Sequence, residues 1–261
     1  MPRRRTPIVT FLTDFGTQDA YVAAMKAAVL RQTRDVHLID ITHEISAQDV
    51  LGGSIALERA VASFPPGTIH VAVVDPGVGT NRRLLAVSTN SQQVLCPDNG
   101  LITWAWRRFG GTARELTWRP DSYSRTFHGR DILAPAAGML AAGKSLATLT
   151  RTLSGPLLLD LFMARGEEGA IIHFDRFGNA TTNIPAGHVP PNASICLRKH
   201  NLGRLQRTYG EVSVGEPLAL IGSSDLLEIA VRNGSARREL KLSLGDKVWV
   251  RRDKRVKTDG V

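Results

Sequence analysis

Short apolar runs alternate with longer amphipathic segments in the first half of the chain. The apolar runs have the length and the Val, Ile and Leu content of buried strands, and they span 7–15, 36–42, 68–75, 84–90 and 92–98. Segments 21–33 and 48–64 lie between the first three runs and have the length and pattern of helices. Alternating strands and helices predict an α/β domain with a mainly parallel sheet.

The pattern changes in the second half of the chain. From Ala170 onward, short strand-like runs are separated by Gly and Pro turns, without a convincing long helix; the runs span 170–179, 193–199, 216–222, 227–233 and 247–253. This pattern predicts a smaller β-barrel-like domain. We therefore expect an α/β domain at 1–154, a linker at 155–169 and a β-barrel-like domain at 170–261.

Length and composition favour a folded protein without a membrane segment. A chain of 261 residues with 43% hydrophobic residues can bury a substantial core. No apolar run approaches the roughly 20 residues that cross a bilayer, and the first residues lack the apolar centre of a signal peptide. These features predict a cytoplasmic location. The two cysteines, Cys96 and Cys196, have no metal-binding spacing and are expected to be buried thiols.

The net charge of +9 raises the possibility of nucleic-acid binding. Arg3, Arg4 and Arg5 contribute +3, and residues 237–257 hold nine basic and three acidic side chains. Basic chain ends without interleaved aromatic residues are more typical of solvated segments than of a specific nucleic-acid site. We expect no specific nucleic-acid partner.

Asp75, Arg82 and His128 are the candidate catalytic residues. Asp75 ends a buried strand, and Pro76-Gly77 turns the chain towards Arg82. Arg82 supplies a permanent set of donors, while His128 is the one group of the three that exchanges protons near neutral pH. Together they are suited to orienting and deprotonating a water molecule. An internal ion pair beside an ordinary loop histidine is the alternative interpretation.

Asp14 and Asp19 are candidate substrate-binding residues in the first domain. Asp14 ends the first strand, where open α/β sheets hold ligands, and its carboxylate suits the vicinal hydroxyls of a ribose. Asp19 stands before a helix, so it either caps that helix or meets a ligand amine. The segment Asp40–Ile45 contains Asp, His and Glu, but its spacing argues against a metal site and favours a turn. No metal or organic cofactor is expected.

The second domain carries two further polar sets. Asp175, Phe177 and Asn179 offer a carboxylate, an aromatic face and an amide, which suit a purine, although a β-turn with a core Phe has the same sequence. Ser223, Glu228 and Val231 offer a hydroxyl, a carboxylate and exposed strand backbone that could complete a ligand wall.

Six motifs in order resemble one known family across nearly the whole chain. They are FLTDFGTQDAY, DITHEI, VAVVDPGVGTNRR, PDNGL, TFHGRD and FDRFGN. Together they resemble the S-adenosylmethionine hydrolases, also called hydroxide adenosyltransferases, which are related to fluorinases and chlorinases. The family's two-domain layout agrees with the domain organisation predicted above.

The resemblance implies cleavage of S-adenosyl-L-methionine by water at the ribose 5′ carbon, giving adenosine and L-methionine. It places Asp75, Arg82 and His128 on the water-activating triad and Asp14 on the ribose. Further positions that it implies are the adenine pocket at Phe177 and Asn179 and second-domain contacts at Ser223, Glu228 and Val231. It also implies a homotrimer, with each active site between one subunit's first domain and a neighbour's second.

Two other functions are compatible with these motifs. The halogenating relatives typically have a tyrosine at the Asp75 position and a serine-containing halide pocket near His128, so Asp75 and Gly129 favour hydrolysis over halide-dependent adenosyl transfer. A non-catalytic adenosine or S-adenosylmethionine binding protein would use the same pocket with a purely structural triad. Ser224 and Asp225 stand where the family often has a glycine, which makes contacts to the methionine end the least defined.

Overall fold

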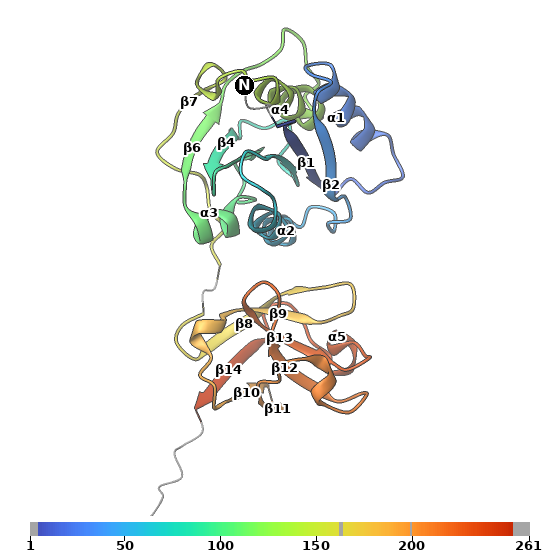
Figure 1. The fold of residues 1–261 in the computed structure, drawn as a ribbon, viewed down its shortest axis with the longest axis vertical. Coiled ribbons are helices and arrows are strands. Elements are labelled where there is room, and N and C mark those ends of the chain that lie inside the picture. Colours follow the sequence, from blue (N-terminus) through green and yellow to red (C-terminus); the bar gives the residue numbers. More distant parts are fainter. Residues whose placement is uncertain (1–4, 162–163, 199, 253–261) are drawn as a thin grey trace, which may run out of the picture. The chain divides into compact units, whose positions relative to one another are not determined.

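All five strands expected in the first half of the chain are present in the protein, a computed structural model that describes residues 5–161, 164–198 and 200–252. Arg3, Arg4 and the basic residues after Arg252 lie outside the described residues. The chain divides into two units, Met1–Leu159 and Asp160–Val261 (Figure 1).

The first unit contains a seven-stranded sheet in the order β2-β1-β3-β5-β4-β6-β7. The strands are β1 (Ile8–Thr13), β2 (His37–Thr42), β3 (Ile69–Val73), β4 (Leu84–Thr89), β5 (Gln92–Pro97), β6 (Thr112–Leu116) and β7 (Thr150–Thr152). The four strands β2, β1, β3 and β5 run parallel to one another. Strands β4, β6 and β7 extend the sheet with antiparallel pairs. The parallel half confirms the predicted α/β class.

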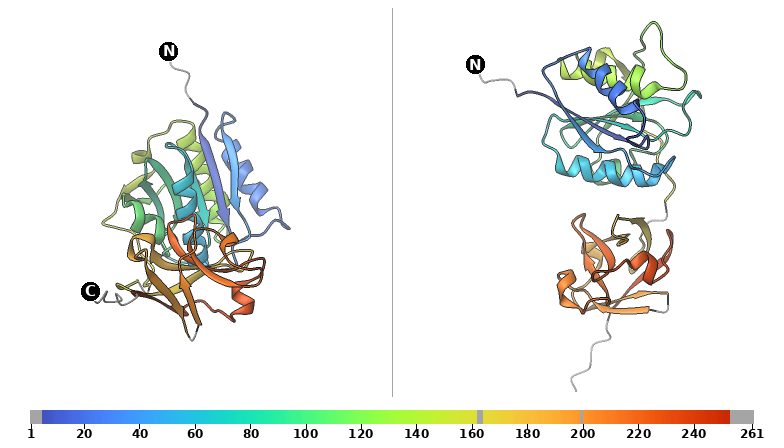
Figure 2. Two further views of the ribbon diagram at one scale, coloured as in Figure 1. Left: turned by 60° about the horizontal axis from the view of Figure 1, so that its bottom comes forward. Right: turned by 90° about the vertical axis from the view of Figure 1, so that its right-hand side faces the viewer.

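Helices cover both faces of this sheet (Figures 1 and 2). On one face, α1 (Tyr21–Leu30) and α4 (Ala134–Ala141) pack with the π-helical turn η1 (Gly129–Leu133) over a core that includes Val9, Phe11 and Val71. On the other face, α2 (Val50–Ser63) and α3 (Thr103–Phe109) pack over Leu12, Ala72 and Val74. Alternate residues of β1 and β3 therefore serve two cores, which is why these strands are buried on both faces.

Local chemistry explains where α2 begins and ends. Asp49 caps it by accepting a hydrogen bond from Gly52 N at 2.9 Å. The helix stops at Phe64 because Pro65 and Pro66 follow, and a residue before proline avoids the helical conformation.

The turn Pro97–Gly100 holds the end of the first unit in place. The Asp98 carboxylate accepts hydrogen bonds from Arg83 Nε and from Leu157 N, both at 2.7 Å. Thr103 Oγ1 accepts from Leu159 N at 2.9 Å. These hydrogen bonds attach the backbone at Leu157 and Leu159 to the rest of the first unit.

The second unit is an antiparallel sheet in the order β11-β10-β14-β8-β9-β13-β12. Its elements are β8 (Glu168–Phe174), β9 (Ala180–Pro185), β10 (Ala193–Leu197), β11 (His200–Arg204), β12 (Pro217–Ile221), β13 (Leu226–Val231), α5 (Ala236–Glu239) and β14 (Lys247–Arg252). After β11, Gln206 N donates to Ala219 O of β12 at 2.8 Å, which brings the two sheet edges together. The sheet is thereby nearly closed around its core, which confirms the barrel-like prediction.

Short elements with weak patterns escaped the sequence analysis. Among them, β7 has three residues, and α4 contains Pro135 and Gly138, which are poor helix formers. Tertiary packing explains α4: a Cβ on Gly138 would lie 2.8 Å from Gln32 Cβ and 2.9 Å from Val29 O, so Gly138 allows α4 and the end of α1 to approach closely.

Gly138→Ala is expected to lower the free energy of unfolding by about 1–3 kcal/mol, because the new methyl group overpacks this contact. This loss should outweigh the gain in helix propensity of up to about 1 kcal/mol. Chemical denaturation measures the change. The control is Gly155→Ala, whose Cβ meets nothing within 4 Å. A Gly138→Ala protein as stable as the control would contradict this account of the packing.

Candidate active site

Two carboxylates converge at the carboxyl ends of neighbouring parallel strands. Asp14 follows β1 and Asp75 follows Val74 at the end of β3, and Thr13 pairs with Val73 in register. Within the sheet, β2 lies on one side of β1 and β3 lies on the other, so the chain changes direction across the sheet after β2. Such a topological switch point opens a crevice beyond the strand ends, where open α/β sheets hold ligands. The position of both side chains therefore follows from the strand order.

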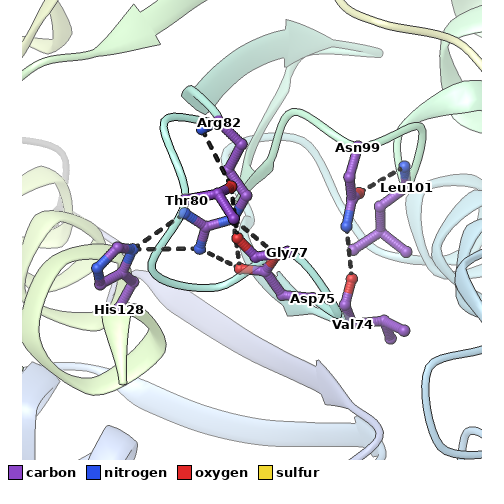
Figure 3. A network of polar contacts seen from close by, with 8 residues as sticks. All are labelled: Val74, Asp75, Gly77, Thr80, Arg82, Asn99, Leu101 and His128. Carbon is purple, nitrogen blue, oxygen red and sulfur yellow. Dashed lines mark hydrogen bonds and ion pairs between the residues drawn. The ribbon is translucent and has the colours of Figure 1, made fainter. Parts of the chain in front are cut away.

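Asp75 forms a buried ion pair with Arg82 (Figure 3). Arg82 Nε lies 2.7 Å from Oδ1 and 2.8 Å from Oδ2, and Nη2 also contacts Oδ2. The two side chains are only 6% and 8% exposed. Because one unpaired charge at this depth would be costly, each group requires the other.

The loop between these residues folds back so that Arg82 reaches Asp75. Val78 N donates to Asp75 O and Thr80 N donates to Gly77 O, both at 3.2 Å. Gly79 has a φ of +83°, and a Cβ there would lie 3.0 Å from Arg125 O. Glycine is therefore required for both the turn and the close approach. On the other side of the strand end, Asn99 Nδ2 donates to Val74 O at 2.8 Å (Figure 3).

His128 completes the network through Nδ1. Arg82 Nη1 and Nη2 each lie 3.1 Å from this nitrogen. Because a guanidinium only donates hydrogen bonds, Nδ1 must accept, so the ring is neutral and Nε2 carries the hydrogen. Burial lowers the pKa of His128 below its ordinary value, and the positive charge of Arg82 lowers it further. Nε2 points away from Arg82 (Figure 3).

The π-helical turn η1 places His128 beside the strand ends. His128 is the residue immediately before Gly129–Leu133. A Cβ on Gly129 would lie 3.3 Å from Met25 Sδ and 3.4 Å from Val73 Cγ2, so glycine lets this turn pack closely against α1 and β3. π-helical turns occur frequently at functional sites.

These residues surround a cavity of about 350 Å³, which is within the range of small-molecule pockets. Its lining combines two carboxylates and a histidine with apolar and aromatic groups: Asp14, Phe15, Ala47, Gln48, Val73, Asp75, Pro76, Val78, Thr126, Phe127, His128 and Gly129. Phe15, Tyr21 and Phe127 form an edge-to-face cluster, with centroids 5.2–5.8 Å apart. The predicted residues Asp14, Asp75 and His128 thus share one cavity, and Arg82 contacts two of them.

Asp14 and Asp19 differ in their surroundings. Asp14 Oδ2 accepts a hydrogen bond from Gln48 N at 2.8 Å, and Asp14 lines the cavity. Asp19 is exposed, and α1 begins after Ala20 without a side-chain capping bond. The interpretation of Asp19 as a helix cap is therefore wrong. Its contact with a ligand stays a prediction.

In the second unit, Asp175, Phe177 and Asn179 form the turn between β8 and β9. Asp175 Oδ1 accepts from Phe177 N and Asn179 N at 2.9 Å, and Oδ2 accepts from Asn179 Nδ2 at 3.0 Å. Phe177 is 76% exposed, so the alternative of a β-turn with a core Phe is wrong. The turn presents an aromatic face to the surface of this unit.

Ser223, Glu228 and Val231 lie along the β12–β13 hairpin. Ser223 is exposed in the turn, and Glu228 Oε1 accepts a hydrogen bond from Tyr209 OH at 2.6 Å. Val231 is 4% exposed and packs in the barrel core, while its carbonyl accepts from Gly234 N at 3.1 Å. The expectation of an open strand backbone at Val231 is therefore wrong for its carbonyl group. Burial of Glu228's partner Tyr209 raises the pKa of that phenol, and the carboxylate raises it further.

Within the described ranges, no group of three or more His, Cys, Asp or Glu side chains is arranged to hold a metal ion. In the same part of the chain, no helix has the length and hydropathy needed to span a membrane.

Comparison with known proteins assigns the family. The N-terminal domain of SAM hydroxide adenosyltransferases matches residues 9–150, and the C-terminal domain matches residues 169–249. This chain belongs to the SAM hydroxide adenosyltransferase family. It is 39% identical to the (R)-S-adenosyl-L-methionine hydrolase of Thermus thermophilus, over 91% of this chain and 96% of that protein.

More distant and structural relatives agree with this assignment. A fluorinase of Actinoplanes sp. is 26% identical over 70% of this chain and 74% of that protein. The crystal structure of an uncharacterized conserved protein from Thermotoga maritima superposes with a TM-score of 0.86 at 34% identity, covering 94% of this chain and all of that one. The resemblance to the hydroxide adenosyltransferases is confirmed.

Sequence analysis did not predict some of the residues that line the cavity. Gln48 contributes its backbone N–H from a left-handed conformation with φ 66°, which its residue type does not indicate. Ala47 lines the cavity only because of loop geometry. Phe15 and Phe127, by contrast, fall within the motifs that identify the family.

His128 is expected to titrate below pH 6.5 in the folded protein. Folding then favours the neutral ring, because the imidazole binds a proton more weakly in the folded protein than in the unfolded chain. As the pH falls from about 6.5 to the lower pKa of the folded protein, the unfolded chain is protonated first and the free energy of unfolding decreases. NMR titration of the imidazole, assigned with His128→Asn, measures the pKa. Arg82→Gln should raise it, because a positive charge and a donor to Nδ1 are lost. An unchanged pKa in Arg82→Gln would contradict the role of Arg82.

Proposed function

We propose that this protein hydrolyses S-adenosyl-L-methionine to adenosine and L-methionine, with water attacking the ribose 5′ carbon. The observation that carries the proposal is the Asp75–Arg82–His128 network at the edge of the cavity that Asp14 also lines. A purely structural ion pair would not require a histidine or a cavity beside it. Similarity to the (R)-S-adenosyl-L-methionine hydrolase of Thermus thermophilus also supports this proposal.

The chemistry suits such a site. A C5′–O bond forms while the C5′–S bond breaks, and the electron pair of that bond stays on sulfur. The leaving methionine is a neutral thioether, so it needs no general acid, and one proton leaves the water. Positive charge on sulfur disappears during the reaction, which a poorly hydrated pocket favours. The proposal includes no cofactor, and S-adenosyl-L-methionine is the substrate.

Each member of the network has a distinct proposed role. Asp75 accepts a hydrogen bond from the attacking water and then its proton, since a carboxylate oxygen can accept more than one hydrogen bond. Arg82 pairs with Asp75 and keeps Nδ1 of His128 occupied. His128 orients the water with its Nε2–H instead of acting as the first base, because its basic nitrogen already accepts from Arg82.

The remaining predicted residues are assigned to substrate binding. Asp14 binds the ribose hydroxyls, and Asp19 meets the substrate's charged end. Phe177 stacks on adenine, while Asp175 and Asn179 fix the turn that presents it. Ser223, Glu228 and Val231 complete the second-unit contacts. A homotrimer and a cytoplasmic location are part of this proposal, the trimer from the family resemblance and the location from the sequence.

Asp75→Asn and His128→Ala should each lower kcat by roughly 100-fold or more while substrate binding is largely retained. Asp75→Asn keeps an acceptor beside Arg82, whereas Asp75→Ala would leave that buried charge unpaired. Mass spectrometry of reactions in heavy-oxygen water measures turnover, and adenosine should carry the heavy oxygen at its 5′ position. Full turnover in either folded variant would contradict the assigned roles. Substrate that binds but stays intact with the unmodified protein would favour a binding protein.

Halide-dependent adenosyl transfer is the second candidate, because fluorinases are relatives. Gly129 offers no hydroxyl for a halide, and Asp75 adds a negative charge at the nucleophile's position. Reactions with added chloride or fluoride should therefore yield adenosine and no 5′-halogenated adenosine. Chromatography with mass detection distinguishes the products. Accumulation of the halogenated product at the expense of adenosine would favour transfer to halide.

A further inference from the structure

His43 lies behind the cavity, within a motif that the proposed function does not use. It is 5% exposed, and its Nδ1 lies 2.8 Å from Thr13 Oγ1 at the end of β1. Thr13 Oγ1 in turn accepts a hydrogen bond from Phe15 N at 3.2 Å. Asp14, the proposed ribose-binding residue, stands between the two. The Thr13 hydroxyl thus links the buried His43 ring to the backbone N–H on the far side of Asp14.

The outer side of His43 determines its tautomer. Nε2 lies 3.0 Å from Asp40 Oδ1, although the approach is too poorly aligned for a well-formed hydrogen bond. Lys26 Nζ donates to Asp40 Oδ2 at 2.6 Å. The carboxylate beside Nε2 favours the hydrogen on that nitrogen, so Nδ1 accepts from the Thr13 hydroxyl. Partial burial of Asp40 opposes its ionisation, but Lys26 and His43 outweigh this effect and lower its pKa.

His43 also joins the two loops that form this wall of the cavity. Gly16 N, in the loop after β1, donates to His43 O at 2.8 Å. Five residues after His43, Gln48 N donates to Asp14 Oδ2 at 2.8 Å, from a left-handed backbone that is unusual for glutamine. The loop after β2 therefore holds the Asp14 segment at its backbone and its side chain.

We propose that His43 and Thr13 are positioning residues that fix the Asp14–Phe15 wall of the cavity and thereby set the affinity for the adenosine part of the substrate. This inference rests on the proposed role of Asp14 in binding the ribose. His43 contacts no substrate and takes no part in proton transfer in this assignment. It acts through Thr13.

The same strand offers a matched control. Thr10, also on β1 and also buried, lies 2.7 Å from His70 Nδ1, and the other ring nitrogen contacts Gln92. Thr10 and His70 do not line the cavity. Thr10→Val and Thr13→Val therefore remove chemically equivalent hydroxyls, one away from the cavity and one beside it.

The experiment measures adenosine binding to the full-length protein by calorimetry, together with kcat and KM for S-adenosyl-L-methionine. Thr13→Val should raise the adenosine Kd and KM about tenfold, the effect of losing one buried hydrogen-bond partner, with a smaller change in kcat. Thr13→Ser keeps the hydroxyl and should restore affinity to within about threefold. Thr10→Val should leave the Kd within about twofold of the unmodified protein, whatever stability it loses.

A second pair tests the outer contact at exposed positions, where folding is less at risk. Asp40→Asn removes the charge beside His43 and should raise the adenosine Kd about threefold. Asp35→Asn changes an exposed carboxylate that accepts a hydrogen bond from Thr6 Oγ1 at 3.2 Å and does not line the cavity, so it should have no effect. Adenosine affinity that is unchanged in both Thr13→Val and Asp40→Asn would overturn the inference.

Asp14→Ala separates this inference from the function on which it rests. If Asp14→Ala loses affinity while the Thr13 and Asp40 variants bind normally, the role of Asp14 stands and the positioning role of His43 is wrong. If Asp14→Ala binds adenosine as tightly as the unmodified protein, the proposed ribose contact itself is wrong, and the inference fails with it.

Discussion

The buried ion pair between Asp75 and Arg82 is the interaction on which the rest of the site depends. Neither charge has much access to water, and Arg82 uses the remaining donors of its guanidinium on His128. Removing one partner would leave a buried charge and release the imidazole. One ion pair therefore sets the position of the carboxylate, the tautomer of the histidine and the charge at the edge of the cavity.

The fold brings this pair to the edge of the cavity through strand order. Because β1 and β3 are parallel neighbours, Asp14 and Asp75 emerge on the same edge of the sheet, 61 positions apart in the sequence numbering. Glycines then allow close approach where side chains would collide, at Gly79 against Arg125 O and at Gly129 against Met25 and Val73. The site is a product of backbone proximity as much as of its charged groups.

The hydrogen-bond directions change the chemical interpretation of His128. Its residue type suggests a base for the attacking water, but its acceptor nitrogen faces a permanent donor. In the proposed mechanism, Asp75 is therefore the proton acceptor and His128 orients the nucleophile. A neighbouring charged group also sets the tautomer of His43, where Asp40 favours the form in which Nδ1 accepts from the Thr13 hydroxyl.

The sequence by itself determined the α/β class, the strands β1 to β5, the barrel-like second half and the choice of Asp14, Asp75, Arg82 and His128 as candidate site residues, because these depend on local apolar patterns and on motifs. It did not determine α4, the exposed side chain of Phe177, the engaged carbonyl of Val231 or the link from His43 to Thr13. Only the tertiary structure decided these features. Burial and hydrogen-bond direction arise from contacts between residues distant in sequence, and no local pattern encodes them.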